Sequence, residues 1–219
     1  MSFKNIIVFG AHGQIGQHFL RFASASGIKS TAVIRNSEQA SKITQIASGV
    51  TAKEITVDGS SVEELGAAIS GHDAVVLTLG SRGKSLLQVD LDGTVKVFEA
   101  AVLAKVRRLV LISAANAENR EWFSKTSLRD YYIAKHYADR ILVNEFKQSL
   151  DFTILQPGAL TDGASTKKFG HLGGETRSVD REDVAYAILE TLNDKETYGK
   201  SIPFVNGNTD IGEFFKNVK

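Results

Sequence analysis

Residues 6–16 read Ile6-Ile7-Val8-Phe9-Gly10-Ala11-His12-Gly13-Gln14-Ile15-Gly16, an apolar run followed by three glycines. A strand ending at Gly10 can turn tightly, Gly13 lets the backbone approach a pyrophosphate, and Gly16 lets the next helix pack closely. The first free N–H groups of that helix face the phosphates. Glycines also mark ordinary turns, but this place between strand and helix predicts a dinucleotide-binding turn. Residues 10–16 are therefore candidate cofactor ligands.

The composition is that of an ordinary globular domain that binds small molecules. The chain has 219 residues, 42% of them hydrophobic, which favours a single domain over residues 1–219. Absence of cysteine excludes disulfides, thiolate metal sites and a cysteine nucleophile, and we expect no metal ion. Lys and Arg (26) balance Asp and Glu (25), so no net field attracts nucleic acid or a membrane. We expect a small-molecule substrate and, without a signal or membrane span, the cytoplasm.

Strand-like and helix-like patterns alternate along the chain, which predicts a doubly wound parallel sheet of the Rossmann type with helices on both faces. We expect residues 1–160 to form the cofactor-binding core and 161–219 a small segment on the substrate side. A glycine-rich stretch, 163–174, is expected to be a mobile loop. The expected strands are Asn5 to Phe9, Ser30 to Ile34, Ala52 to Val57, Ala74 to Leu79, Arg108 to Ser113, Phe152 to Gln156 and Ile202 to Val205.

Three helix starts carry capping patterns. Ser60 and Ser61 precede Glu63 and Glu64 as two overlapping capping boxes. Ser127 with Asp130, and Asp180 with Asp183, offer the same spacing.

The end of the second expected strand bears on which dinucleotide is bound. At the position where an acidic residue grips the adenosine ribose, the chain has Arg35 and Asn36. A guanidinium can bind a 2′-phosphate in bidentate fashion, so the sequence favours NADP(H) over NAD(H). The alternative is that Arg35 is a solvated charge. Glu38 suits the first turn of the next helix.

Further motifs resemble one family nearly end to end, the atypical short-chain dehydrogenase/reductases. These are the small NAD(P)H-binding branch related to NmrA-like regulators and to the epimerase/dehydratase group. The motifs are Val57-Asp58-Gly59, Asp90-Leu91-Asp92-Gly93-Thr94, Val106 to Ser113, Tyr131-Tyr132-Ile133-Ala134-Lys135, Asp151 to Gly158, Arg181 to Ala185 and Gly199 to Val205.

The resemblance implies roles for several cofactor-side residues. Asp58, followed by Gly59, matches the residue that contacts adenine, although it could also cap a turn. Leu79 and Gly80 match the strand end under the adenosine side. Pro157 and Gly158 match the turn beside the nicotinamide. His12 departs from the family's small hydroxyl residue, so its phosphate contact could come from the ring or only from the backbone.

Tyr131, Lys135 and Ser113 are the candidate catalytic residues. Tyr131 and Lys135 lie four apart on one helix face, so the ammonium could favour the phenolate. The resemblance implies that Tyr131 is the acid or base, that Lys135 binds the nicotinamide ribose, and that Ser113 orients a carbonyl. Alternatives remain open. Lys135 could pair with Asp139, Ser113 could be a cap, and Tyr132 and Tyr137 are rivals for Tyr131.

Asp90 is a fourth candidate catalytic residue, and it is a departure from the resemblance. Extended relatives carry an Asn there that supports a proton relay. Asp90 could hold a water, pair with Lys135, or be a solvated helix carboxylate. Gly93 is expected to be a packing glycine.

The segment after Leu160 is short, which disfavours a large sugar nucleotide as substrate. Thr161, Asp162 and the 163–174 loop could close over a small ligand or be ordinary surface. Trp122 and Phe123 could line the same pocket or be core. Three hypotheses follow: an NADPH-dependent oxidoreductase of a small substrate, a non-catalytic NADP(H)-binding redox sensor, and a flavin or tetrapyrrole reductase.

Overall fold

The computed structural model describes residues 3–174 and 176–218. Its first half runs through β1 (Asn5–Phe9), α1 (Gln14–Ala25), β2 (Lys29–Ile34), η1 (Ser37–Gln39), α2 (Ala40–Thr44), β3 (Val50–Glu54), α3 (Val62–Ile69), β4 (Ala74–Leu77), η2 (Leu86–Gly93), α4 (Thr94–Leu103) and β5 (Arg108–Ile112). The second half holds α5 (Arg120–Phe123), α6 (Arg129–Glu145), β6 (Asp151–Pro157), β7 (Ala159–Thr161), β8 (Lys168–Gly170), β9 (Ser178–Asp180), α7 (Arg181–Asn193), η3 (Lys195–Thr197), β10 (Lys200–Asn206), β11 (Thr209–Asp210) and α8 (Ile211–Lys216).

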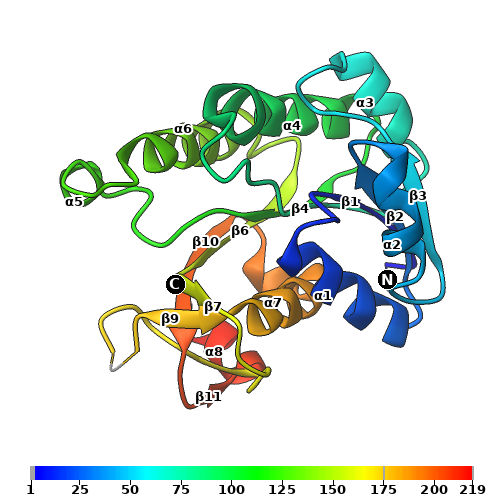
Figure 1. The fold of residues 1–219 in the computed structure, drawn as a ribbon. Helices are drawn as coiled ribbons and strands as arrows, with labels where there is room; N and C mark the ends of the chain where they lie inside the picture. Colours follow the sequence, from blue (N-terminus) through cyan, green and yellow to red (C-terminus); the bar gives the residue numbers. More distant parts are fainter. Residues whose placement is uncertain (1–2, 175, 219) are drawn as a thin grey trace.

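A nine-stranded sheet forms the centre, in the order β11-β8-β10-β6-β5-β4-β1-β2-β3. The strands β1 to β6 and β10 pair in parallel, and β8 and β11 pair antiparallel at one edge. Helices α3, α4 and α6 cover one face and α1 and α7 the other (Figure 1). The predicted doubly wound Rossmann-type fold is confirmed.

Alternate residues of β1 supply two separate cores, one on each face. Ile6 and Val8 pack with residues of α1 and α7, such as Phe19 and Ile188. Ile7 and Phe9 belong to the cluster under α3 and α4. Since both faces are covered, β1, β4 and β5 are continuous apolar runs, as buried parallel strands require.

Most expected strands are confirmed with small changes at their ends, but the third is misplaced. It spans Val50–Glu54 rather than Ala52 to Val57, because its pairing with β2 runs from Val50 opposite Ser30 to Glu54 opposite Ile34, and Val57 lies in the turn that follows. Four short strands, β7, β8, β9 and β11, were not predicted. Their two or three residues pair with segments distant in sequence, so no local pattern marks them.

One of the expected capping patterns forms as a reciprocal box. Ser61 Oγ accepts from Glu64 N while Glu64 Oε2 accepts from Ser61 N, and α3 follows. The Ser127–Asp130 prediction is wrong, because α6 begins after Leu128 without a side-chain cap. The Asp180–Asp183 box is also wrong. Asp180 makes no side-chain cap, and the Asp183 carboxylate accepts hydrogen bonds from residues 165–167 instead.

Residues 165–167 belong to the stretch expected to be a mobile loop, 163–174. Buried Asp183 accepts hydrogen bonds from Ser165 Oγ, Thr166 N and Lys167 N, and Lys168–Gly170 forms β8. A carboxylate with several backbone and hydroxyl donors fixes a loop firmly. These contacts oppose mobility in residues 163–170, and the mobility of the stretch 163–174 stays a prediction.

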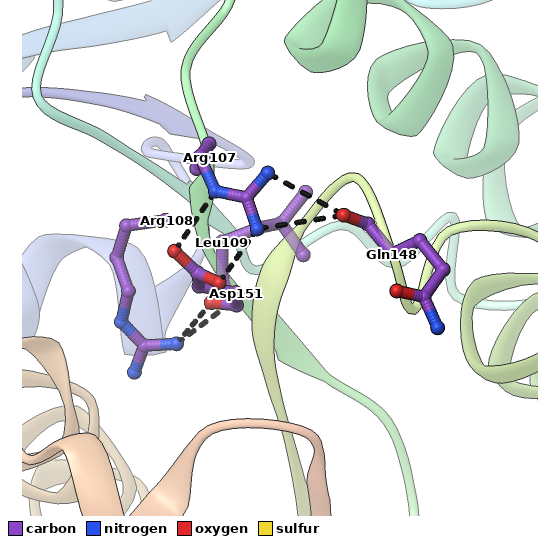
Figure 2. Close-up of polar contacts among 5 residues, drawn as sticks. All are labelled: Arg107, Arg108, Leu109, Gln148 and Asp151. Carbon is purple, nitrogen blue, oxygen red and sulfur yellow. Dashed lines mark hydrogen bonds and ion pairs between the residues drawn. The ribbon is translucent and has the colours of Figure 1, made fainter.

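Two consecutive arginines stand at the amino-terminal end of β5 and behave differently (Figure 2). Arg107 is exposed and pairs with Asp151 Oδ1 at 3.0 Å. Arg108 is 2% exposed and donates from all three guanidinium nitrogens to backbone carbonyls, including Thr191 and Leu192 at the end of α7. Arg108 thus ties α7 to the sheet.

No helix within residues 3–174 and 176–218 is long and apolar enough to cross a membrane.

Candidate active site

The sheet order reverses between β1 and β4, where the connections leave in opposite directions. In doubly wound sheets, ligands bind at the carboxyl ends of the strands beside this switch point. The carboxyl ends of β1, β4, β5 and β6 lead into the glycine turn, Leu79, Ser113 and Pro157 respectively. The fold therefore gathers the predicted cofactor-side and catalytic segments at one edge.

The glycine turn has the geometry that a dinucleotide requires. Gly10 has φ +80°, and Gly13 N donates to Gly10 O at 2.9 Å. A Cβ on Gly16 would lie 2.7 Å from Gly10 O and 2.8 Å from Ala11 Cα, so the helix reaches the turn only without a side chain. Helix α1 starts at Gln14 with no acidic residue in its first turn. These residues fit a pyrophosphate held by backbone N–H groups.

A group of cationic side chains lies at the end of β2. Arg35 and Asn36 are exposed directly after the strand. Partial burial, followed by the charges of Lys42 and Arg35, lowers the pKa of the His12 imidazole. Lys42 was missed by the sequence reasoning, because it lies in α2 and only the fold brings it toward the glycine turn.

The residues that the resemblance assigns to the adenosine side lie in connecting segments that are exposed or partly buried. Asp58 is exposed, and the cap of its turn is Thr56, whose Oγ1 accepts from Gly59 N at 3.2 Å. The alternative that Asp58 is the cap is thus not supported, and no described residue donates to its carboxylate. Gly80 is exposed with open space around its Cα, while Leu79 is partly buried.

Lys135 is buried, at 3% exposure, at the ends of β4 and β5. Its Nζ donates to Leu79 O at 3.1 Å and to Ile112 O at 3.2 Å, and its third N–H has no acceptor among the described residues. Burial lowers the pKa of the ammonium, although Asp90 and Asp139 oppose this. The suggested ion pair with Asp139 is not formed within the described part of the chain.

Tyr131 lies one turn before Lys135 and is partly buried. The Lys135 Nζ stands 5.8 Å from the centre of the phenol ring, over its face. Burial, with the negative charges of Asp90 and Asp139, raises the pKa of the Tyr131 hydroxyl. The shift runs opposite to the expectation that the ammonium favours the phenolate, because desolvation and two carboxylates disfavour the charged form. Tyr131 is held as a neutral phenol.

Ser113 follows β5 and is buried, and its hydroxyl proton is donated to another side chain. Its Oγ donates to Asp139 Oδ2 at 2.6 Å, and Gln156 Nε2 donates to the same oxygen at 3.2 Å. Burial raises the pKa of Asp139 to about 6, with Glu118 adding to the rise, while Ser113, Gln156 and Lys135 oppose it. The other carboxylate oxygen, Oδ1, is buried without a described partner. Sequence reasoning considered Asp139 only as a partner for Lys135.

Asp90 is fully buried in the π-helical segment η2, so the suggestion of a solvated carboxylate is wrong. Its carboxylate accepts from Ser81 N at 3.0 Å, which fixes the chain after Gly80. Gly93 is a packing glycine as expected, because a Cβ there would lie 2.6 Å from Val57 Cγ2. Asp90 therefore shapes the loop beside the site and adds negative charge near Tyr131 and Lys135.

The turn that the resemblance assigns to the nicotinamide side, and the aromatic residues Trp122 and Phe123, are placed as follows. Pro157 is buried at the end of β6, and a Cβ on Gly158 would lie 2.5 Å from Arg177 O. Phe123 is buried and stacks on Tyr132, whereas Trp122 is 42% exposed. Phe123 is thus core, as the plainer alternative expected.

The strand order, switch point and glycine turn together define a Rossmann-type dinucleotide-binding protein. A family model described as NAD(P)H-binding matches residues 10–195. The chain belongs to this NAD(P)H-binding family, whose structural neighbours are oxidoreductases and epimerase/dehydratase-like proteins. The resemblance stated from the motifs is confirmed at this level.

Relatives match over nearly the whole chain. The protein UPF0659 YMR090W of Saccharomyces cerevisiae is 37% identical over 231 residues, covering 100% of both chains. The uncharacterized sugar epimerase YhfK of Bacillus subtilis is 36% identical, covering 97% of this chain and 99% of its own. Among solved structures, the oxidoreductase ylbE of Lactococcus lactis is 35% identical with a TM-score of 0.88, covering 97% of this chain and 95% of its own.

Proposed function

We propose that this protein is an NADP(H)-dependent oxidoreductase that reduces a small substrate, with Tyr131 as proton donor. The observation that carries the proposal is the placement of Tyr131 and Lys135 on one face of α6 beside the switch point. When bound, the cofactor supplies the hydride. The residues that would hold it are those of the glycine turn, Arg35, Asn36, Asp58, Gly59, Leu79, Gly80, Lys135, Pro157 and Gly158.

The state of the Tyr131 phenol supports the reducing direction. Hydride addition leaves negative charge on a carbonyl oxygen, and a neutral donor at that oxygen lowers the barrier. Since burial and nearby carboxylates raise the pKa of Tyr131, the hydroxyl carries its proton at neutral pH. It makes no hydrogen bond to any described residue, which leaves the proton available to a ligand.

Ser113 has a different part in the proposal from the one implied by the resemblance. Because its proton goes to Asp139, it offers a ligand an acceptor lone pair while Asp139 is ionised. It then suits an N–H or O–H group of the cofactor or substrate. Asp90 keeps the neighbouring loop in place.

The preference for NADP(H) rests on the charges at the end of β2. Arg35 and Lys42 are close enough to His12 to lower its pKa, so the field there is positive. A 2′-phosphate adds negative charge at this position and gains from a guanidinium and an ammonium. Titration with NADPH and NADH, followed by nicotinamide fluorescence, tests this: we expect tighter NADPH binding, and equal affinities would refute the preference.

The test of catalysis is Tyr131→Phe, with Tyr132→Phe as matched control. With NADPH and 9,10-phenanthrenequinone as a small diketone probe, we expect turnover to fall about 100-fold in Tyr131→Phe. NADPH affinity should be unchanged, and Tyr132→Phe should behave as wild type.

Other results would favour the competing functions. No turnover of this probe or of flavin mononucleotide by the wild type, with NADPH bound, would favour a non-catalytic redox sensor. Turnover of flavin mononucleotide that survives Tyr131→Phe would favour a flavin or tetrapyrrole reductase, in which the protein supplies mainly a slot.

A further inference from the structure

A charged pair from the C-terminal segment stands at the start of α1. Arg181, the first residue of α7, donates from Nη1 to Asp162 Oδ1 at 2.6 Å. Gln14, the first residue of α1, donates from Nε2 to the same oxygen at 3.4 Å. The Arg181 side chain is 22% exposed and that of Asp162 is 66% exposed. A segment 148 positions away in sequence therefore reaches the glycine turn.

The position of this ion pair matters because the glycine turn is the proposed site of the cofactor's negatively charged pyrophosphate. A pyrophosphate at the start of α1 would carry negative charge next to Asp162, and an unpaired carboxylate there would repel it. The paired guanidinium removes that repulsion. Arg181 makes no second hydrogen bond within the described residues, so its other N–H groups remain for phosphate oxygens.

We propose that Arg181 is a binding residue for the cofactor's pyrophosphate, and that Asp162 holds its guanidinium in position beside Gln14. The inference rests on the glycine turn being the cofactor site, as in the proposed function. Arginine suits this role because its planar fork binds phosphate oxygens in pairs. The family resemblance assigned no ligand to this part of the chain, where Asp162 was considered only as part of a closing segment.

A purely structural role for the pair makes an opposite prediction. If the ion pair only held the end of β7 against α7, loss of either partner would break the same contact. Both variants would then change cofactor binding in the same direction. If Arg181 binds the phosphates, the two variants act in opposite directions. Asp162→Asn removes a repelling charge but keeps an amide oxygen that can accept from Arg181, whereas Arg181→Gln leaves the Asp162 charge uncompensated.

The experiment measures dissociation constants of NADPH, NADH and ADP-ribose for wild type, Arg181→Gln, Asp162→Asn and the double variant. Arg140→Gln, an exposed arginine on α6, controls for loss of one positive charge. We expect Arg181→Gln to weaken all three ligands roughly fivefold, since a partly exposed ionic contact is worth up to about 1 kcal/mol. Asp162→Asn should bind as tightly as wild type or tighter, with the double variant between the two single variants.

Several results would overturn the assignment. These are equal weakening by both single variants, an effect of Arg181→Gln no larger than that of Arg140→Gln, or a loss for NADPH that ADP-ribose does not share. Thermal unfolding of each variant shows whether a loss comes from the fold. Because NADH and ADP-ribose carry the same pyrophosphate, the test does not depend on the NADP(H) preference or on turnover.

Discussion

Charged side chains are buried at both ends of β5, but their hydrogen bonding differs. At the amino-terminal end, each nitrogen of the Arg108 guanidinium donates to a carbonyl, and the group lies 4.4 Å from the centre of the Tyr198 ring. At the carboxyl end, Lys135 has one N–H without a described acceptor and Asp139 has one buried oxygen without a described donor.

The difference separates a structural charge from charges that, in the proposed function, remain available to a ligand. A buried polar group that lacks its partners costs free energy, so it persists where that capacity is used in another state. Burial lowers the pKa of Arg108 to about 10, which still leaves it charged at neutral pH. Burial lowers the pKa of Lys135 and raises that of Asp139, bringing both nearer to neutral pH.

The largest expected effect is at the amino-terminal end of β5, where every nitrogen of the Arg108 guanidinium has an acceptor. Arg108→Leu removes a donor from the carbonyls of Thr191, Leu192 and Asp151, of which Thr191 O still accepts from Asp194 N. We expect it to lower the free energy of unfolding by ~3 kcal/mol. Denaturant unfolding measures this change. NADPH affinity of the folded variant should be that of wild type.

The neighbouring residue is the matched control for that variant. Arg107 carries the same charge, but it pairs with Asp151 on the surface (Figure 2). Arg107→Leu should change stability by no more than about 1 kcal/mol. Equal losses of stability in the two variants would show that the burial of Arg108 contributes nothing to the free energy of unfolding.

Asp139→Asn tests the carboxyl end of β5 through the pH dependence of stability. The folded protein holds the Asp139 proton up to a pKa of about 6, whereas the ordinary value is 3.8. The native state therefore binds more protons than the unfolded chain between these values, so this group's contribution to stability falls as pH rises from about 4 to 6.

We expect the stability of wild type relative to Asp139→Asn to fall by on the order of 2–3 kcal/mol across that range. Urea unfolding at several pH values measures the difference between the two proteins, in which the other carboxylates cancel. Asp130→Asn, an exposed carboxylate on the same helix, should run parallel to wild type. A constant difference for Asp139→Asn would mean that Asp139 titrates as an ordinary surface carboxylate.

The sequence predicted the backbone of the site better than its electrostatics. The glycine turn, the alternating strands and helices of a doubly wound sheet, and the placement of Tyr131 and Lys135 follow from local patterns, because strand, turn and helix signals span a few residues. The roles of Asp139 and Asp90 could not be predicted, since their buried state depends on packing between α6, β5, β6 and η2. The contact of Asp162 with Gln14 joins segments that no local pattern relates.

The β5 comparison is sharpened most by Lys135→Met, although its expected effect is the smallest. Methionine keeps the unbranched shape and removes the charge, so the relief of the buried ammonium's desolvation cost offsets the two hydrogen bonds lost to Leu79 O and Ile112 O. We expect stability to be unchanged or slightly higher, and NADPH affinity to fall about tenfold because the third N–H no longer meets the cofactor. Lys147→Met, an exposed residue after α6, is the control. If Lys135→Met instead destabilised the fold as Arg108→Leu does and left NADPH binding intact, Lys135 would be a second structural charge.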